Sequence, residues 1–375
     1  MRVGINALLL NQSAGYRQTG VSRYIDRLLR ALPGAMVSDE LVAYVGRGME
    51  LQNPVATGSL RTAAIDVERP TARIAWEHLA LPMLARRDHL DIFHGPVNAI
   101  PLGLPCPSIV TVHDLAFLRF PDQVTAKRYQ YLSRTVRASV RRAKRVIAVS
   151  EGTKQDIVEL LDFAPEKIAV TPLGVDARFQ ALDEAGLKQF RSQAGIERPY
   201  VLFVGTLEPR KNLPRLVEAF STIASDVPHD LVIIGPEGWL TSNIHESAAQ
   251  LLEQRRIQFR GFVPDGQLPA WYSACDLFAY PSLYEGFGLP ALEAMACAAP
   301  VLTSCVSALP EVVGDAALTV DPLDVHAIAD GMRQILTNAD LRIDLGRRGP
   351  ERSRQFTWVR TAELTVEVYR EAAQR

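Results

Sequence analysis

Short apolar runs that alternate with helical or loop segments are the feature that most restricts the fold of this chain. They lie at residues 2–10, 41–45, 91–93, 108–112, 145–149 and 168–170 in the first half, and at 200–205, 231–234, 257–260, 277–280, 301–303 and 317–320 in the second. Apolar strands separated by helices are typical of a parallel sheet covered on both faces. The sequence therefore predicts an α/β protein with two Rossmann-like, doubly wound parallel sheets.

The apolar pattern weakens near the middle of the chain, which predicts where the two sheets separate. After residue 175 a polar helical segment continues for about twenty residues. We interpret 1–175 as the N-terminal domain, 176–196 as a linker and 197–355 as the C-terminal domain. A last amphipathic helix is expected at about 358–373.

Composition and charge restrict the class of protein. Hydrophobic residues make up 47% of the chain and charged residues 22%, which is ordinary for a globular protein. The formal net charge of −1 gives no general attraction to nucleic acid, so no nucleic-acid partner is predicted. The cysteines have no C-x-x-C or metal-ligand spacing, and we interpret them as apolar residues of a reducing compartment. No cleavage site and no uninterrupted apolar span is evident, which predicts a cytoplasmic protein.

One stretch of the second half, YPSLYEGFGLPALEAMA at 280–296, combines two carboxylates with a glycine-rich turn. Glu285 and Glu293 stand eight positions apart, and Gly286 and Gly288 lie between them. Glycine permits backbone angles that other residues resist and lets a ligand approach the main chain closely. A lone glutamate would be read as a solvated loop residue or a partner of a helix dipole. The full pattern is more specific than that.

The same stretch predicts the start of a helix. Pro290 suits the first turn, so Glu285 is expected in the loop and Glu293 within that first turn. Free N–H groups at a helix start suit a phosphate or diphosphate. A carboxylate beside such an anion is useful as an acceptor for neutral hydroxyls, of which sugars carry many.

A basic pair follows the first strand of the second half. Arg210 and Lys211 precede a helix that Asn212 can cap, and they lie at the carboxyl edge of the predicted sheet. Two adjacent cations suit a diphosphate, and arginine can bind it bidentately. The alternative is an ordinary basic pair on the surface.

In the first half, His113 and Asp114 directly follow a predicted strand, at the edge where ligands of such sheets bind. His94 ends another strand and is a weaker candidate. Gly20 lies in a loop between strand and helix, which can cradle an anion or simply form a turn. Val21 stands where a P-loop requires lysine, and no G-x-G-x-x-G follows a strand, so a kinase or dehydrogenase is not predicted.

Residues 127–145 hold eight lysines and arginines and no acidic residue. Apolar residues recur there at helical spacing, which predicts a basic amphipathic helix. It is either a solvated helix flank or a surface that meets anionic lipid headgroups or a lipid-diphosphate acceptor. In the second case the protein would dock peripherally on the inner face of the membrane.

Five motifs together resemble one family of enzymes. TGVSRY, TVHDLAF, AVSEGTK, VGTLEPRKNL and the stretch at 280–296 occur in the order and spacing of glycosyltransferase family 4, whose members are retaining enzymes that use nucleotide sugars. The resemblance covers nearly the whole chain. It implies the GT-B fold, in which two Rossmann-like domains face each other across a cleft and the C-terminal helix, here within 356–375, crosses back onto the first domain.

The resemblance also implies roles for individual residues. Glu285 would contact hydroxyls of the donor sugar, Glu293 would hold the ribose, and His113 would face the sugar's hydroxymethyl end. Arg210 and Lys211 would stabilise the leaving diphosphate. The remaining donor-binding candidates are Gly20, Asp114, Phe262, Val263, Gly286, Phe287, Gly288 and Leu289, with Phe262 and Val263 beside the nucleotide base.

The motifs look most like those of bacterial polysaccharide mannosyltransferases, which makes GDP-mannose the leading donor and a glycan or lipid-linked molecule the expected acceptor. A UDP-sugar is the nearest alternative donor. A catalytically silent protein that binds nucleotide sugars is an alternative of a different class. No D-x-D metal motif is evident, so we expect the enzyme to need neither metal nor cofactor.

Overall fold

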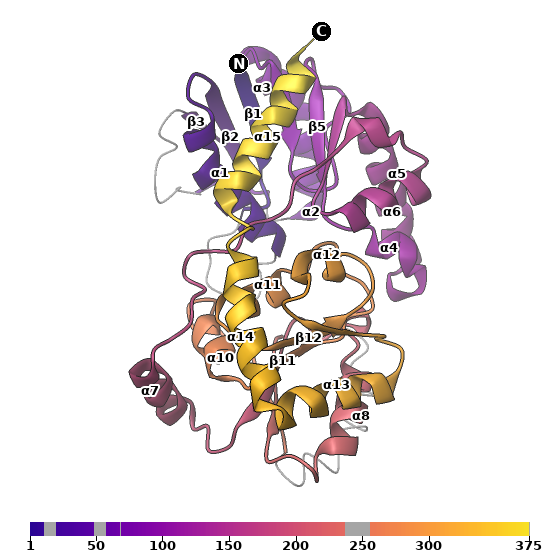
Figure 1. The fold of residues 1–375 in the computed structure, drawn as a ribbon. Helices are drawn as coiled ribbons and strands as arrows, with labels where there is room; N and C mark the ends of the chain where they lie inside the picture. Colours follow the sequence, from indigo (N-terminus) through magenta and orange to yellow (C-terminus); the bar gives the residue numbers. More distant parts are fainter. Residues whose placement is uncertain (11–19, 49–57, 68, 237–255, 375) are drawn as a thin grey trace. The chain divides into compact units, whose positions relative to one another are not determined.

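The computed structural model describes residues 1–10, 20–48, 58–67, 69–236 and 256–374, and the chain forms two compact units (Figure 1). The first unit comprises Met1–Gly174 and Thr357–Arg375, and the second comprises Val175–Phe356. Each has its own sheet and apolar core. The segment 176–196, which we expected to be a linker, belongs to the second unit. Its helix α7 (Glu184–Ala194) packs against α10 (Leu268–Ala274), where the rings of Phe190 and Trp271 lie 5.1 Å apart.

The first unit contains a seven-stranded parallel sheet in the order β3-β2-β1-β4-β5-β6-β7. Its strands are β1 (Arg2–Ala7), β2 (Glu40–Val45), β3 (Gly58–Thr62), β4 (Ile92–Gly95), β5 (Ser108–Val112), β6 (Arg145–Ala148) and β7 (Ile168–Val170). Its helices are α1 (Gly20–Ala35), α2 (Pro70–Ala75), the π-helix Trp76–Ala80, α3 (Leu81–Arg87), α4 (Ala116–Arg119), α5 (Ala126–Arg142), α6 (Glu151–Leu161) and α15 (Trp358–Ala373).

The second unit contains a six-stranded parallel sheet in the order β10-β9-β8-β11-β12-β13. Its strands are β8 (Tyr200–Val204), β9 (Asp230–Ile234), β10 (Ile257–Gly261), β11 (Leu277–Tyr280), β12 (Val301–Ser304) and β13 (Leu318–Val320). Besides α7 and α10, its helices are α8 (Leu213–Ile223), α11 (Leu289–Ala296), α12 (Leu309–Val313), α13 (Val325–Thr337) and α14 (Ala339–Ser353).

Both sheets have the doubly wound arrangement that the alternating apolar runs predict. In each, the strand order reverses beside the first strand, between β1 and β4 in the first unit and between β8 and β11 in the second. Ligands of such sheets bind outside the carboxyl ends of the strands at this reversal point. Ligand-binding residues are therefore expected in the loops that follow β1, β4, β8 and β11.

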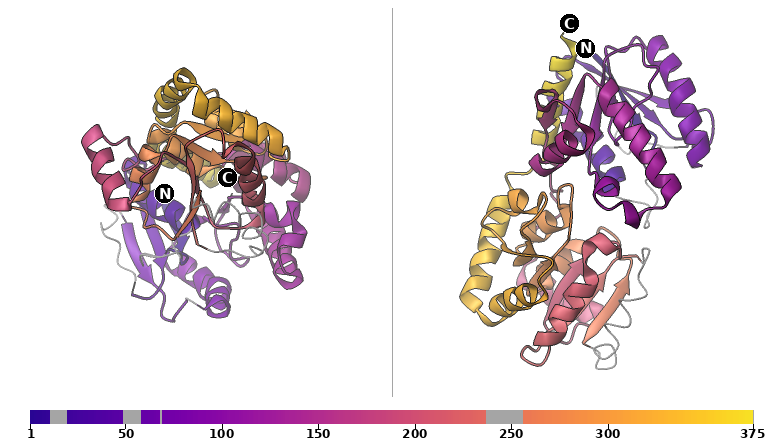
Figure 2. Two further views of the ribbon diagram at one scale, coloured as in Figure 1. Left: turned by 90° about the horizontal axis from the view of Figure 1, so that it is seen from below. Right: turned by 90° about the vertical axis from the view of Figure 1, so that its right-hand side faces the viewer.

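The C-terminal helix α15 packs against α1 and across β4, β5 and β6, and Figures 1 and 2 show it (yellow) against the first unit. A buried polar network holds it there. His94 Nδ1 lies 2.7 Å from the Tyr369 hydroxyl, and His94 Nε2 lies 2.8 Å from Thr111 Oγ1. The Tyr24 hydroxyl lies 3.2 Å from the same Thr111 oxygen. Burial lowers the pKa of His94 to about 3, so its ring is neutral. His94, the weaker of the two histidine candidates, therefore ties α15 to the sheet.

Within the described residues, no helix combines the length and the apolar character needed to cross a membrane.

The network predicts a stability effect of one hydroxyl group. Tyr369→Phe keeps the ring but leaves the buried Nδ1 of His94 without its partner, so we expect the free energy of unfolding to fall by about 1–3 kcal/mol. Urea denaturation measures it, with Tyr131→Phe on the exposed side of α5 as the matched control. Equal stability of the two variants would show that the network does not hold α15.

Candidate functional site

Three side chains meet the carboxylate of Glu285 at the carboxyl edge of the second sheet. Lys211 Nζ lies 2.6 Å from Glu285 Oε1, and Arg210 donates to Oε2 over 3.1 Å. The Tyr280 hydroxyl donates to Oε1 over 2.8 Å and accepts from Lys211 Nζ over 2.5 Å. The second guanidinium nitrogen of Arg210 lies 2.7 Å from Glu208. The basic pair and the first glutamate, which the sequence separates by more than seventy residues, thus form one cluster.

The topology brings this cluster together. Arg210 and Lys211 follow β8. Tyr280 ends β11, the neighbour of β8 across the reversal point, and Glu285 follows β11. A backbone hydrogen bond from Leu283 N to Arg210 O, 2.8 Å long, joins the two loops. The cluster is therefore built from the two strands between which a doubly wound sheet opens for its ligand.

Asn212 also joins these loops, in a way that differs from our prediction. We expected its side chain to cap α8, but it forms no cap hydrogen bond. Its Nδ2 instead donates to the carbonyls of Pro281 (2.9 Å) and Pro322 (2.6 Å). The reason is the left-handed backbone of Asn212, with φ of 61°, whereas a capping side chain normally extends from a β-region residue. The prediction of a side-chain cap was wrong.

The charges in the cluster balance one another. Burial alone would oppose ionisation of Glu285, but the charges of Lys211 and Arg210 and the hydrogen bonds from Lys211 and Tyr280 outweigh it and lower the pKa of Glu285 to about 2. Burial lowers the pKa of Lys211, as does the charge of Arg210, while the charge of Glu285 opposes both. Glu285 is thus ionised at neutral pH, and two carboxylates face two cations.

The glycine-rich turn places the start of α11 beside the cluster. Gly288 has φ of 106°, and a Cβ there would lie 2.7 Å from Leu309 Cδ2, so a larger residue would be both strained and crowded. Gly286 and Phe287 are buried, and Leu289 is half-buried as the first residue of the helix. The Glu285 loop is further fixed by Ser307, whose Oγ accepts from Glu285 N over 3.1 Å.

Glu293 lies one turn farther along α11 than we predicted. The helix begins at Leu289, one residue before Pro290, so Glu293 is its fifth residue and belongs to the second turn. Its side chain is buried and accepts from the Tyr272 hydroxyl over 3.3 Å. The helix start itself is free of acidic residues. It therefore retains the positive end of its dipole for an anion.

Two further donor-binding candidates follow β10 at the same edge. Phe262 is 44% exposed, whereas Val263 packs against the core of the second unit. Gly235, which directly follows β9, donates its N–H to the carbonyl of Gly261 over 2.8 Å and so joins the ends of β9 and β10. Phe262 therefore has an exposed aromatic ring on which another ring can stack.

In the first unit, His113 lies at the carboxyl edge of its own sheet. Its Nε2 is 2.8 Å from the carbonyl of Pro96, and its backbone N–H donates to Asn98 Oδ1 over 2.9 Å. The ring of Tyr24 meets it edge-on at 4.6 Å. Burial lowers the pKa of His113 against the effect of the Pro96 carbonyl, so the ring is neutral. Since a carbonyl can only accept, Nε2 carries the proton and Nδ1 is the acceptor.

The two other candidates of the first unit have different surroundings. Asp114 Oδ1 accepts from Ala116 N over 3.1 Å, so this carboxylate shapes the turn into α4. Gly20 is the exposed first residue of α1, and a Cβ there would meet no atom within 4 Å. Residues 11–19, which precede Gly20, lie outside the described residues.

Sequence reasoning missed several members of the site: Tyr280, Glu208, Asn98 and Ser307. Their position at strand ends or in the adjacent loops was the available signal. Tyr280, for example, ends a strand, and residues in the loop that follows it were already predicted to bind the donor. Only the structure shows that its hydroxyl turns toward the charges.

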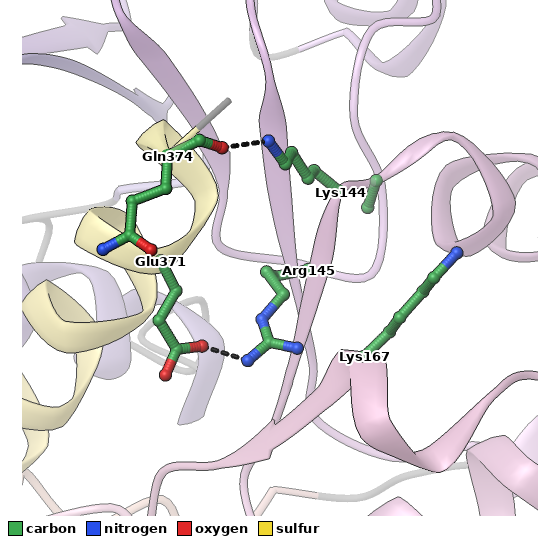
Figure 3. Close-up of a pocket in the computed structure, with 6 residues that line it drawn as sticks. Lys144, Arg145, Lys167, Glu371 and Gln374 are labelled. Carbon is green, nitrogen blue, oxygen red and sulfur yellow. Dashed lines mark hydrogen bonds and ion pairs between the residues drawn. The ribbon is translucent and has the colours of Figure 1, made fainter.

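The first unit also has a basic pocket of about 540 Å³, lined by Ala143, Lys144, Arg145, Lys167, Glu371 and Gln374 (Figure 3). Arg145 begins β6 and Lys167 precedes β7, so the pocket lies at the amino edge of the sheet, opposite to His113. Lys144 donates to the Gln374 carbonyl over 2.5 Å, and Arg145 pairs with Glu371. These contacts fasten the end of α15, and the pocket is separate from the candidate site.

Comparison with known proteins decides the family. The model of "Glycosyltransferase Family 4" matches residues 18–179, and that of "Glycosyl transferases group 1" matches residues 187–352. The chain is 31% identical over 369 residues to the O-antigen chain mannosyltransferase B of Escherichia coli, with 95% of this chain and 97% of that protein covered. The chain belongs to the glycosyltransferase family that these two models describe. It is therefore an enzyme that transfers hexosyl groups.

Other similarities agree with this assignment. The glycosyltransferase is 31% identical over 284 residues to the alpha-maltose-1-phosphate synthase of Mycolicibacterium smegmatis, with 71% of this chain and 73% of that protein covered. It shares its fold with the sucrose-phosphate synthase of Thermosynechococcus elongatus (TM-score 0.75, 21% identity, 99% and 98% of the two chains). Anabaena HepE in complex with UDP and glucose is similar (TM-score 0.75, 17% identity, 99% of both chains). The GT-B fold predicted from the sequence is confirmed.

The charge cluster predicts how stability depends on pH. The pKa of Glu285 in the folded protein is below its unfolded value of 4.5, so its stabilising contribution is complete above about pH 4.5 and is lost as the pH falls toward 2. Denaturation of the wild type and Glu285→Gln across this range should show a difference in unfolding free energy that narrows with acidification. Glu367→Gln, on the exposed face of α15, is the control. A difference that is constant with pH would contradict the ion-paired state of Glu285.

Proposed function

We propose that this glycosyltransferase moves mannose from GDP-mannose to a glycan or lipid-linked acceptor during polysaccharide synthesis, with retention of the anomeric configuration. The observation that carries the proposal is the cluster of Arg210, Lys211 and Glu285 beside the start of α11. The choice of mannose is supported by the similarity to the O-antigen chain mannosyltransferase.

The cluster supplies what departure of a diphosphate requires. When the anomeric C–O bond breaks, negative charge builds on the leaving diphosphate. Arg210, Lys211 and the N–H groups at the start of α11 offer fixed positive potential for this charge. Because Glu285 and Tyr280 already hold the Lys211 ammonium in place, little reorganisation is needed at the moment of reaction.

Glu285 and His113 orient the donor sugar in this proposal. An ionised carboxylate accepts hydrogen bonds from sugar hydroxyls, and the neutral His113 ring offers Nδ1 as an acceptor for the hydroxymethyl group. Glu293 takes the ribose hydroxyls. Gly20, Asp114, Gly286, Phe287, Gly288, Leu289, Phe262 and Val263 complete the proposed surroundings of the donor.

Retention follows from a front-face route. The acceptor oxygen forms its bond to the anomeric carbon on the face that the diphosphate leaves, and the acceptor proton passes to an oxygen of the leaving phosphate. No separate base is needed, since the leaving group takes the proton. We propose that neither metal nor cofactor takes part, because Arg210 and Lys211 supply the positive charge.

A panel of labelled GDP-, UDP- and ADP-sugars, screened for binding and slow hydrolysis, tests the donor assignment. We expect GDP-mannose to be selected and turnover to survive EDTA. Selection of a UDP-sugar would replace the donor, and binding without any hydrolysis or transfer would indicate a silent binding protein. Activity that EDTA abolishes and a divalent ion restores would overturn the metal-free proposal.

Substitutions of Lys211 and Glu285 should impair the enzyme in different ways. Lys211→Ala removes charge stabilisation that grows as the diphosphate leaves, so we expect kcat to fall by about 10²–10³. Glu285→Gln removes the charged acceptor for sugar hydroxyls and leaves the cations without their partner. It should therefore keep or gain affinity for GDP while losing its preference for GDP-mannose over GDP.

Calorimetry with GDP and GDP-mannose, beside turnover, separates these cases, and thermal unfolding checks that each variant is folded. Glu367→Gln serves again as the control. Wild-type turnover of GDP-mannose by a folded Glu285→Gln would contradict the role of the cluster.

We also propose that the basic helix α5 docks on anionic lipid headgroups. Its exposed cations are Lys127, Arg128, Arg134, Arg141 and Arg142, and Tyr131 among them is 45% exposed. No acidic residue interrupts the segment 127–145. Such a face attracts an anionic surface through its summed charge.

Flotation with anionic and neutral vesicles tests this docking. Binding to anionic vesicles should weaken with salt, because screening limits such attraction to about 8 Å at physiological ionic strength. Arg134→Glu combined with Arg141→Glu should abolish it, whereas Lys188→Glu on α7 of the second unit should not. Equal flotation of both variants, or none by the wild type at any salt, would make α5 an ordinary solvated helix.

A further inference from the structure

The crossover between β3 and β4 contains a π-helical turn, Trp76–Ala80, between α2 and α3. The N–H of Leu81 bonds to the carbonyl of Trp76, five residues back. The next residue, Pro82, has no N–H and would crowd the carbonyl four residues before it, which gives a local reason for the wider turn. Single π-turns inside helices are frequent at functional sites. This one holds the glutamate Glu77.

Glu77 is held against the end of β1. Its Oε1 accepts from Asn6 Nδ2 over 3.0 Å, and Asn6 is the penultimate residue of that strand. The other end of the Asn6 amide is also engaged, because Oδ1 accepts from Leu8 N over 3.3 Å. The amide is therefore oriented from both ends, and it fixes one oxygen of the Glu77 carboxylate.

The second carboxylate oxygen of Glu77, Oε2, differs from the first in its contacts. Among the residues that the structure describes, Asn6 is the hydrogen-bond partner of Glu77, and Oε2 has none. Glu77 is half-buried, and burial raises its pKa, against the opposing effects of the Asn6 hydrogen bond and the charges of Arg73 and His78. A carboxylate kept partly out of water with one oxygen unpaired is well suited to accept from neutral hydroxyls.

The position of Glu77 suits a second sugar. Asn6 lies near the end of β1 on one side of the reversal point, and His113 follows β5, with β4 alone between the two strands. Neighbouring strands lie about 4.8 Å apart, so the ends of β1 and β5 are separated by roughly 10 Å along one edge. The proposed donor contact of His113 and the carboxylate of Glu77 therefore belong to one face of the first unit.

We propose that Glu77, held by Asn6, binds a hydroxyl group of the acceptor saccharide and so positions the acceptor beside the donor sugar. The proposal rests on the proposed transferase function. It assigns the acceptor side of the reaction, to which none of the motif residues was assigned. Its chemistry requires a neutral polyol rather than an anion, because a carboxylate repels phosphate.

Kinetics with octyl α-mannoside as the acceptor probe and GDP-mannose as the donor tests it. Glu77→Gln keeps an oxygen for Asn6 but turns the unpaired acceptor into an N–H donor, so the fold is retained while the contact is lost. We expect the KM for octyl α-mannoside to rise about tenfold or more, as loss of a charged hydrogen-bond acceptor implies, with the KM for GDP-mannose near the wild-type value. Asn6→Ala should raise the acceptor KM less, and the exposed Glu367→Gln should not raise it.

The outcomes separate the two proposals. If the wild type turns over GDP-mannose and Glu77→Gln leaves the acceptor KM unchanged, the Glu77 contact is wrong and the transferase proposal stands. If the wild type hydrolyses or transfers none of the sugar nucleotides, the proposed function fails, and binding of octyl α-mannoside, followed by NMR, judges Glu77 instead. Weaker binding to the variant then supports the contact. Equal binding, or none to the wild type, overturns it.

Discussion

The buried ion pair between Lys211 and Glu285 is the interaction around which the second unit is arranged. Removing two charges from water is costly, and such pairs contribute little net stability. This one is retained with three supports: the Tyr280 hydroxyl bridges both charges, Arg210 takes the second carboxylate oxygen, and Asn212 ties the loops together. A role in stability alone does not explain why so many buried polar contacts lie at the edge of the sheet where ligands of this fold bind.

The two units use the same strand order for different chemistry. In the second, the edge beside the reversal point carries full charges and a helix start, which suits a diphosphate. In the first, the corresponding edge carries the neutral ring of His113 and the pair of Asn6 and Glu77, which suit uncharged hydroxyls. The proposed division follows from this: the second sheet binds the nucleotide diphosphate and contributes Glu285 to the donor sugar, and the first sheet contributes His113 to the donor sugar and Glu77 to the acceptor.

The sequence predicted the strands well because apolar runs directly reflect burial in a parallel sheet. It missed β3, whose residues GSLRT form an edge strand with little apolar content. It placed Arg210, Lys211 and Glu285 at strand ends but could not show that they pair, since contact between distant residues depends on which strands become neighbours. The errors at Asn212 and Glu293 have different physical causes. Asn212 has a left-handed backbone rather than the extended one from which a side chain caps a helix, and α11 begins at Leu289, one residue before Pro290.

The ion pair also constrains how the proposed reaction proceeds. A diphosphate that reaches Arg210 and Lys211 must share or replace Glu285 as their partner, so donor binding exchanges one anion for another rather than adding charge to a bare cationic site. An intact donor offers hydroxyls to the displaced carboxylate, whereas the nucleotide product has no sugar to offer. Return of Glu285 to the two cations therefore competes with the product more strongly than with the substrate. In the proposed mechanism, the contact that holds the cations in place before the reaction therefore also favours release of the nucleotide after transfer.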